Sequence, residues 1–570
     1  MPVVGQTSSR FARLMPNAAR LRHYDRAFLR GDLLAGVTVA AYLIPQVMAY
    51  AELAGLPPVV GLWAVLVPMG LYALFGTSPQ LSVGPESTTA VMTAVAIAPL
   101  ALGDSSRYAA LSAALAIVVG VVCLIGYLLR LGFLADLLSR PILVGYMAGV
   151  AMIMISGQLD KTTGVPVDGD GFVEQLRSFF SNVGDVHWAT VALSVAVLVF
   201  LFVFAHFFPR LPVPLIAVLL ATAAAVVLDL SADGILVVGE IPAGFPSPRI
   251  PDVSFDDVLL LIGPALGIAV VGYSDNVLTG RSFASRHHDE VEANQELLAL
   301  GVSNAGAGLT QGFPVSSSGS RTVIGDAVGG RTPLMGIAVA TSVVLVLVFF
   351  RPLLAEFPTA ALGALVMYAA VRLIDVPEFR RLARFRTSEL ALAVATTVGV
   401  LVVDILYGVV IAVALSVLDL FRRVARPHDA VLGRVPDLAG LHDVDDYPEA
   451  ATVPGLVIYR YDAPLCFANA ENFRTRAIAA VDEQPVRVEW FVLNVEAIVE
   501  VDLTASDAVR ELRRELSERG IATGLARLKQ DLRVELERAG ILDEIGEHMI
   551  FPTLPTVLDS FEHRHRDESS

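Results

Sequence analysis

Long apolar runs, separated by short polar stretches, fill the first three quarters of the chain. A helix needs about 20 apolar residues to cross a bilayer, and most of the runs approach that length. The pattern therefore predicts an all-α polytopic membrane domain over residues 33–426 with about fourteen spans. The predicted spans are 33–50, 58–75, 85–100, 107–129, 141–156, 188–208, 212–229, 257–280, 291–307, 314–326, 333–351, 357–373, 387–403 and 407–424.

Charge placement predicts the orientation of these spans. Alternate loops are rich in arginine, most of all the loop that holds Arg380, Arg381, Arg384 and Arg386, whereas the opposite loops are largely acidic. Cytoplasmic loops carry the excess of Lys and Arg, so the arginine-rich side is predicted to be cytoplasmic. Residues 1–32 hold six arginines and no early apolar stretch. They are predicted to be a cytoplasmic segment rather than a signal peptide, and an even number of spans places both termini in the cytoplasm of a cell-membrane protein.

Composition narrows the class of protein. The chain is 55% hydrophobic and 17% charged, whereas a soluble protein carries about 25% charged residues. A net charge of −16 argues against a nucleic-acid partner. The sequence shows no zinc-ligand pattern, no nucleotide-binding loop and no pairing of nucleophile and base, so neither a metal site nor an enzyme is expected.

The composition changes after Pro427. From residue 454 the pattern is that of a small α/β domain, with strand candidates at 455–459 and 490–494. The predicted arrangement is a linker over 427–453 and a C-terminal domain over 454–565.

The membrane part contains a weak internal repeat. Residues 36–42 resemble 267–273, and each is followed about forty positions later by a proline with serines and threonines, in 84–89 and 313–318. Two halves of about seven spans each must have opposite topology, and inverted repeats of this kind are typical of transporters.

The two short segments predict an anion site. A half-helix that begins within the membrane leaves its first N–H groups unpaired, and a proline costs nothing there because it has no N–H. Two such N-termini, at Pro85 and Pro314, would direct positive dipole ends and hydroxyls such as that of Ser87 at an anion. The alternative is that each proline only kinks a continuous helix.

Arg321 lies inside the second short segment, beside Ser318 and Ser320. A buried arginine in a membrane is costly and usually functional, so we expect its guanidinium to contact the substrate with the two serines as neutral donors. The alternatives are an ion pair with Glu86 or a side chain that reaches the inner surface.

Two further pairs share a helix face at i and i+4. Asp275 and Thr279 could bind Na⁺, or the carboxylate alone could carry H⁺; the alternative is a salt bridge or a helix end near Arg281. Gln46 and Tyr50 could donate neutral hydrogen bonds to the anion or serve only in helix packing.

Two motifs make the chain similar to a known family. The segment 35–58, with Pro45, Gln46 and Tyr50, resembles the first-helix signature of the sulfate permease (SulP) family, and 313–330 resembles its tenth-helix motif. The resemblance extends over essentially the whole chain and is greatest to actinobacterial members described as sulfate transporters.

The resemblance implies a seven-plus-seven inverted repeat, with a core domain that carries the anion past a gate domain as an elevator. It implies an anion between the third and tenth helices, with the family's site at Gln46, Tyr50, Ser320 and Arg321. The family's eighth-helix acid corresponds to Asp275, which sodium-coupled bicarbonate members follow with a threonine, as with Thr279 here. A carboxylate beside the anion, at Glu86, departs from that pattern.

The tail resembles a STAS domain, the fold of anti-sigma factor antagonists. Residues 501–506 align with the phosphorylation loop of that fold, and although the usual Asp-Ser-Ser-Gly is missing, Thr504 is a candidate for phosphorylation. The resemblance implies a homodimer and a cytoplasmic regulator bound at this domain.

The hypothesis from sequence is secondary active transport of a small oxyanion, sulfate first, coupled to H⁺ or Na⁺ at Asp275. The alternatives are a Na⁺-coupled bicarbonate or dicarboxylate transporter and an uncoupled anion channel or exchanger. No cofactor is expected other than a Na⁺ ion near Asp275.

Overall fold

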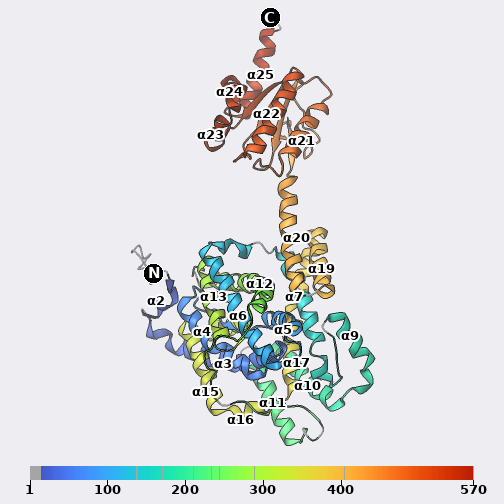
Figure 1. Cartoon of the computed structure of the whole chain (residues 1–570). Helices are drawn as coiled ribbons and strands as arrows, with labels where there is room; N and C mark the ends of the chain where they lie inside the picture. Colours follow the sequence, from blue (N-terminus) through green and yellow to red (C-terminus); the bar gives the residue numbers. More distant parts are fainter. Residues whose placement is uncertain are drawn as a thin grey trace. The chain divides into compact units, whose positions relative to one another are not determined.

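The chain forms two compact units, residues 1–416 and 417–570. The computed structural model describes residues 14–568 except 23, 137–138, 170, 209–210, 231, 233, 243, 288 and 404. Figure 1 shows the course of the chain through both units.

Each predicted apolar segment coincides with a helix, because these runs can satisfy their backbone in a membrane only as helices. The helices are α3 (Leu29–Leu53), α4 (Pro58–Phe75), α5 (Ser87–Ala101), α6 (Ser105–Leu128), α7 (Arg140–Ser156), α10 (Trp188–Phe207), α11 (Val213–Val227), α12 (Phe255–His287), α13 (Ala293–Leu309), α14 (Gly319–Val328), α15 (Leu334–Phe349), α17 (Thr359–Leu373), α19 (Thr387–Val402) and α20 (Ile405–Ala425).

Shorter helices connect them. They are α2 (Pro16–Arg22), η1 (Arg26–Phe28), η2 (Leu131–Asp136), α8 (Leu159–Thr163), α9 (Phe172–Ser181), η3 (Val183–Asp185), α16 (Arg351–Ala355) and α18 (Val376–Phe385). In the described part of the chain, six helical segments are long and apolar enough to cross a membrane by length and composition. The total of about fourteen spans stays a prediction.

Glycines let the helices of the first unit pack closely. A Cβ atom at Gly120 of α6 would lie 2.7 Å from the carbonyl oxygen of Gly301 in α13, and one at Gly308 would collide with the carbonyl oxygen of Ala113. α6 and α13 lie side by side (Figure 1). Small residues bring helix backbones together where lipid gives no hydrophobic drive.

Two very short strands interrupt the helical bundle. β1 (Val83–Gly84) and β2 (Ser316–Ser317) form an antiparallel pair, with Val83 opposite Ser317. α5 and α14 begin directly after these strands, so Pro85 and Pro314 precede the helices. The alternative that these prolines kink continuous helices is wrong.

Side chains satisfy the rest of this non-helical backbone. The amide side chain of Asn304 in α13 accepts a hydrogen bond from Val315 N at 2.9 Å and donates one to Val315 O at 3.0 Å. Thr322 Oγ1 accepts from Ser82 N at 3.1 Å, and Ser318 N donates to Ser82 O at 2.9 Å. These bonds meet the requirement that buried backbone groups find partners.

The second unit is an α/β domain with one mixed sheet. Its strands are β3 (Asp429–Arg434), β4 (Leu441–Asp443), β5 (Leu456–Tyr461), β6 (Trp490–Asn494), β7 (Ala522–Ala526) and β8 (Ile550–Phe551). Its helices are α21 (Ala470–Asp482), α22 (Leu503–Glu518), α23 (Gln530–Arg538), α24 (Ile541–Ile545), η4 (Glu547–Met549) and α25 (Leu554–Glu568).

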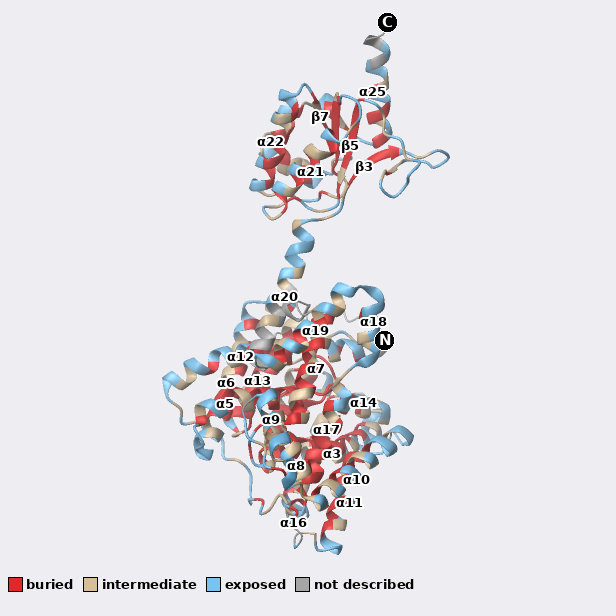
Figure 2. Cartoon of the chain, turned by 90° about the vertical axis from the view of Figure 1, so that its right-hand side faces the viewer, coloured by how far each residue is buried: buried red, intermediate tan, exposed pale blue. Residues whose placement is uncertain are grey.

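The sheet order is β4-β3-β5-β6-β7-β8, parallel from β5 to β8 and antiparallel at β3 and β4. Val457 of β5 lies opposite Phe491 of β6, and both side chains are fully buried. Figure 2 shows these central strands as buried, with the more exposed helices around them. Continuous apolar runs of this kind mark strands that are covered on both faces.

The prediction that 427–453 is a linker is wrong. β3 and β4 lie within that segment, and β3 pairs with β5 through Val431 and Tyr459. β3 has only two buried apolar side chains, Ala430 and Leu432, because the strand is short and alternates inside and outside. A six-residue alternation that contains a glycine and ends in arginine is too weak a pattern to predict a strand.

The paired strands predict a stability difference between two soluble fragments. A fragment of residues 427–568 should unfold about 10 °C above one of residues 454–568, because the shorter fragment leaves β5 as an unpaired edge and exposes its apolar contacts. Circular dichroism during heating measures both midpoints. Equal midpoints would mean that β3 and β4 contribute nothing to the fold.

Candidate functional site

The first unit encloses a cavity of about 390 Å³ between its helices. Its lining comes from α3, α5, α7, α12, α14 and α17, together with β2. Seven of the nine residues predicted for the substrate and cation sites line it: Gln46, Tyr50, Glu86, Ser87, Asp275, Ser318 and Ser320. Sequence reasoning therefore brought together residues from four helices that lie far apart in the chain.

The N-termini of α5 and α14 differ at the cavity. Glu86 caps α5, because its carboxylate accepts hydrogen bonds from Thr88 N at 2.8 Å and from Ser87 Oγ at 2.7 Å. At α14, Ser318 is the N-cap residue but its side chain makes no capping hydrogen bond, and its Oγ lies 3.2 Å from Ser320 Oγ. The chain's own carboxylate thus caps α5, whereas no side chain caps the N-terminus of α14, where a helix dipole favours negative charge.

Arg321 lies behind the cavity lining and is 0% exposed. Its Nη1 donates to Pro85 O at 2.8 Å and to Gln46 Oε1 at 3.4 Å, and its Nε donates to Ser82 Oγ at 3.3 Å. It is too deeply buried to reach the membrane surface, and no ion pair joins it to Glu86, which the structure also describes. Arg321 therefore links α14 to α3 and to the strand before α5.

Gln46 and Tyr50 link Arg321 to the cavity through hydrogen bonds. Gln46 accepts from Arg321 through Oε1 and donates from Nε2 to the Tyr50 hydroxyl oxygen at 2.9 Å. Both residues are almost fully buried, yet both line the cavity. Because a hydrogen bond that a phenol accepts strengthens the one that it donates, this chain makes Tyr50 a better donor to an anion.

Asp275 faces the same cavity from α12. Ser317 Oγ of β2 donates to Asp275 Oδ2 at 3.3 Å. Thr279 lies one turn further along α12 and is not among the lining residues. In the described residues, no group of three or more His, Cys, Asp or Glu side chains is arranged so that it could hold a metal ion. A cation at Asp275 would thus depend on one carboxylate with hydroxyl and carbonyl oxygens, a donor set that suits Na⁺ or H⁺ rather than a transition metal.

Sequence reasoning missed the α17 side of the cavity. Tyr368 and Arg372 line it, and Arg372 Nη1 donates to the Tyr368 hydroxyl oxygen at 2.8 Å. The signal was available, since these residues are four apart near the end of a predicted span. An arginine at the end of a span usually marks only the orientation of that span, so its sequence position alone does not indicate a site.

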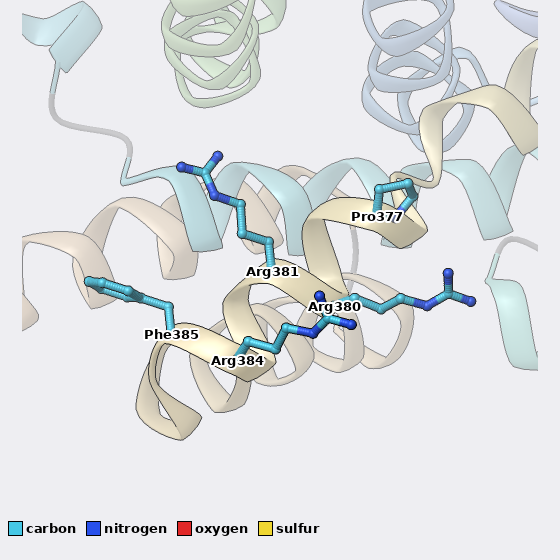
Figure 3. A pocket seen from close by; sticks show the side chains of 5 residues that line it. All are labelled: Pro377, Arg380, Arg381, Arg384 and Phe385. Carbon is cyan, nitrogen blue, oxygen red and sulfur yellow. The ribbon is translucent and has the colours of Figure 1, made fainter.

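The strongest arginine cluster forms a different hollow. Figure 3 shows α18, where Arg380, Arg381, Arg384, Pro377 and Phe385 line a space of about 510 Å³. In that view Arg380 and Arg384 extend to one side and Arg381 to the other. None of these residues lines the first cavity. The segment predicted as a cytoplasmic loop thus contains a short helix with exposed arginines.

Paired helix N-termini, amide and hydroxyl donors and a buried guanidinium inside a helical membrane unit define the class of multi-pass anion transporters. Comparison with known proteins agrees: residues 29–396 match the sulfate permease family and residues 447–557 match the STAS domain. The chain belongs to the sulfate permease family, with a C-terminal STAS domain. The resemblance seen in the sequence is confirmed, and the chain is a transporter rather than an enzyme.

Relatives cover nearly the whole chain. The probable sulfate transporter MT1781 of Mycobacterium tuberculosis is 59% identical over 549 residues, which span 96% of this chain and 98% of that protein. The chloroplastic sulfate transporter 4.1 of Arabidopsis thaliana is 30% identical over 543 residues, 92% of this chain and 79% of the relative.

Two solved structures share the fold. Murine solute carrier 26 family member A9, an anion transporter in an inward-facing state, has a TM-score of 0.87 at 24% identity and covers 97% of this chain and 94% of its own. The transmembrane domain of a cyanobacterial bicarbonate transporter has a TM-score of 0.60 at 24% identity and covers 69% of this chain and 98% of its own. Both confirm the fold of a mostly helical membrane domain. The likeness to the murine protein also extends over the C-terminal domain.

The position of Arg321 predicts a double effect of Arg321→Ala. Sulfate affinity should fall by about 10- to 100-fold, and unfolding should become easier by about 2–4 kcal/mol, because the buried oxygens of Pro85 and Gln46 lose their donor. Ligand-dependent thermal unfolding of the purified protein measures both, with Arg380→Ala as the exposed control. Lost affinity at unchanged stability would instead make Arg321 a direct ligand of the anion.

Proposed function

We propose that the protein is a secondary active transporter of sulfate, coupled to H⁺ or Na⁺ at Asp275. The observation that carries the proposal is the shared cavity: the free N-terminus of α14, the Tyr50 hydroxyl and the Asp275 carboxylate all line it. An anion and a cation held in one space stabilise each other, and that mutual stabilisation couples their movements.

The donors suit a tetrahedral oxyanion. Tyr50 and Gln46 present neutral donors from α3, Ser318 and Ser320 present hydroxyls, and the first N–H groups of α14 add a partial positive charge. Backbone and hydroxyl donors replace the hydration of an anion without binding it irreversibly, which transport requires.

The coupling follows from charge. Asp275 and Glu86 both line the cavity, and each would repel a doubly charged anion. Protonation of Asp275, or Na⁺ bound between Asp275, Thr279 and Ser317, removes one of these negative charges. The anion then binds more tightly with the cation than without it, and by linkage the cation binds more tightly with the anion.

We favour sulfate over bicarbonate or a dicarboxylate because of one relative. That protein is 59% identical over nearly all of both chains and is named a probable sulfate transporter. The cavity volume of about 390 Å³ admits all three anions. Bicarbonate is the second candidate, since the pair Asp275 and Thr279 also fits Na⁺ coupling, and an uncoupled channel or exchanger is the third.

The mouth of the cavity lies where its exposed lining residues are, at Ser320, Val323 and Arg372. Arg372 is in the last turn of α17, just before the arginine-rich helix α18. The predicted orientation puts that end in the cytoplasm, so the cavity would open inward. Alternating access would move the helices that carry the site past the others as an elevator, in line with the inverted repeat.

The STAS domain would hold a homodimer together and bind a cytoplasmic regulator. Thr504, a candidate for phosphorylation, is exposed in the first turn of α22, close to the N-cap residue Asp502. A phosphate there would meet the helix N-terminus but also the carboxylate of Asp502, so its effect would be small.

Labelled-sulfate uptake into proteoliposomes under imposed H⁺ or Na⁺ gradients tests the proposal. Accumulation above the outside concentration, driven by one gradient, is expected. Downhill flux alone would show a channel or exchanger, and flux of bicarbonate without sulfate would move the protein to the second candidate.

The coupling role predicts that Asp275→Asn abolishes the response of uptake to the driving gradient while exchange of internal for external sulfate continues. The amide keeps the size of the side chain but can neither take a proton nor attract Na⁺ as a carboxylate does. Asp256→Asn, at an exposed carboxylate in the first turn of the same helix, is the matched control. Gradient-driven accumulation by Asp275→Asn would place the cation site elsewhere.

A further inference from the structure

The cavity has one cationic side chain in its lining, Arg372. Arg321, the arginine that the sequence motif singles out, is 0% exposed and lies behind the lining, whereas Arg372 is exposed at the mouth. Two carboxylates, Glu86 and Asp275, line the same space. The guanidinium of Arg372 is therefore open to an anion that enters the cavity, whereas that of Arg321 is not part of its lining.

Arg372 is held in place by an aromatic side chain and not by an acid. Its Nη1 donates to the Tyr368 hydroxyl oxygen at 2.8 Å, and its guanidinium carbon lies 5.6 Å from the centre of the same ring. Among the described residues, no carboxylate forms an ion pair with it. Arg372 thus keeps its charge and most of its donors for a ligand.

Tyr42 lines the same cavity between Arg372 and the N-terminus of α14. It comes from α3, and Ser320 of α14 and Tyr368 and Arg372 of α17 line the cavity with it. Arg372 and the N-terminus of α14 therefore face one continuous polar space rather than two separate hollows.

Two ordinary roles explain an arginine at this point of the sequence but not its surroundings. A cation in the last turn of a helix interacts favourably with the helix dipole, and arginines mark the cytoplasmic ends of spans. Both roles are met equally by Arg384 in the last turn of α18, which lines the separate hollow of Figure 3 and not this cavity. Neither role requires a side chain that shares a cavity with two carboxylates and a helix N-terminus.

We propose that Arg372 forms an outer anion subsite at the mouth of the cavity and that it favours a doubly charged oxyanion over a singly charged one. The inference rests on the proposed function of this cavity as an anion site. Coulomb energy is proportional to the charge of the ion, so Glu86 and Asp275 repel sulfate twice as strongly as bicarbonate. Arg372 offsets part of that repulsion, again twice as strongly for sulfate.

The test compares two anions in three variants. Arg372→Gln removes the charge, Arg372→Lys keeps it without the planar fork, and Arg380→Gln is the matched control on α18. The KM and Vmax of labelled sulfate and labelled bicarbonate uptake are measured in proteoliposomes at one ionic strength. Binding of each anion is measured in parallel as the shift of the thermal unfolding midpoint of the purified full-length protein.

Arg372→Gln should raise the sulfate KM about ten-fold and the bicarbonate KM about three-fold, because the logarithm of the effect scales with the charge of the anion. Arg372→Lys should keep the sulfate-to-bicarbonate ratio of the parent protein within about two-fold, and Arg380→Gln should change neither KM.

Other results overturn the inference. An unchanged sulfate KM in Arg372→Gln would leave Arg372 as a helix-end residue, even if the unfolding midpoint falls. Equal rises of the sulfate and bicarbonate KM in Arg372→Gln would contradict the proposed charge selectivity. A changed sulfate-to-bicarbonate KM ratio in Arg372→Lys would contradict it too, and this second measurement decides the question if Arg372→Gln does not fold.

Failure of the proposed function has a different signature. A parent protein that takes up no sulfate would contradict the transport proposal by itself. The midpoint shifts then decide the subsite, since equal sulfate-induced shifts in the parent protein and Arg372→Gln would exclude Arg372 from anion binding.

Discussion

The site depends on one constraint: non-helical backbone inside a membrane bundle must find its hydrogen-bond partners within the protein. β1 and β2 meet it by pairing with each other, and the side chain of Asn304 supplies both missing partners of Val315. Because the two strands are paired, the helices that follow them begin side by side. Two segments more than 200 residues apart in sequence thus deliver their N-termini to the same cavity.

Arg321 stabilises the paired segments from the side that faces away from the cavity. Its guanidinium joins Ser82, Pro85 and Gln46, so a single fully buried side chain holds α14, α3 and the segment before α5 together. Its charge is desolvated and close to the cavity, where electrostatic effects are strong. One residue therefore both positions these segments and places a positive charge close to the cavity.

Much of the fold could be predicted because membrane spans leave a strong pattern in sequence. The fourteen helices and the interruptions before α5 and α14 follow from apolar length and prolines. The gathering of Gln46, Tyr50 and Asp275 at one cavity follows from the resemblance to the sulfate permease family. β3 and β4 could not be predicted, since two buried side chains in a short strand leave almost no periodic signal. Whether Arg321 or Arg372 lines the cavity could not be predicted either, because it depends on packing between helices distant in the chain.

Glu86 gives the cavity a ligand of its own. Its carboxylate occupies the N-terminus of α5 and is attached to the chain that it caps. A tethered group has a local concentration fixed by geometry, which dilution of the surrounding solution does not lower. A soluble anion near α5 therefore always meets a competitor that cannot diffuse away. Built-in competition of this kind weakens the binding of other anions at the N-terminus of α5.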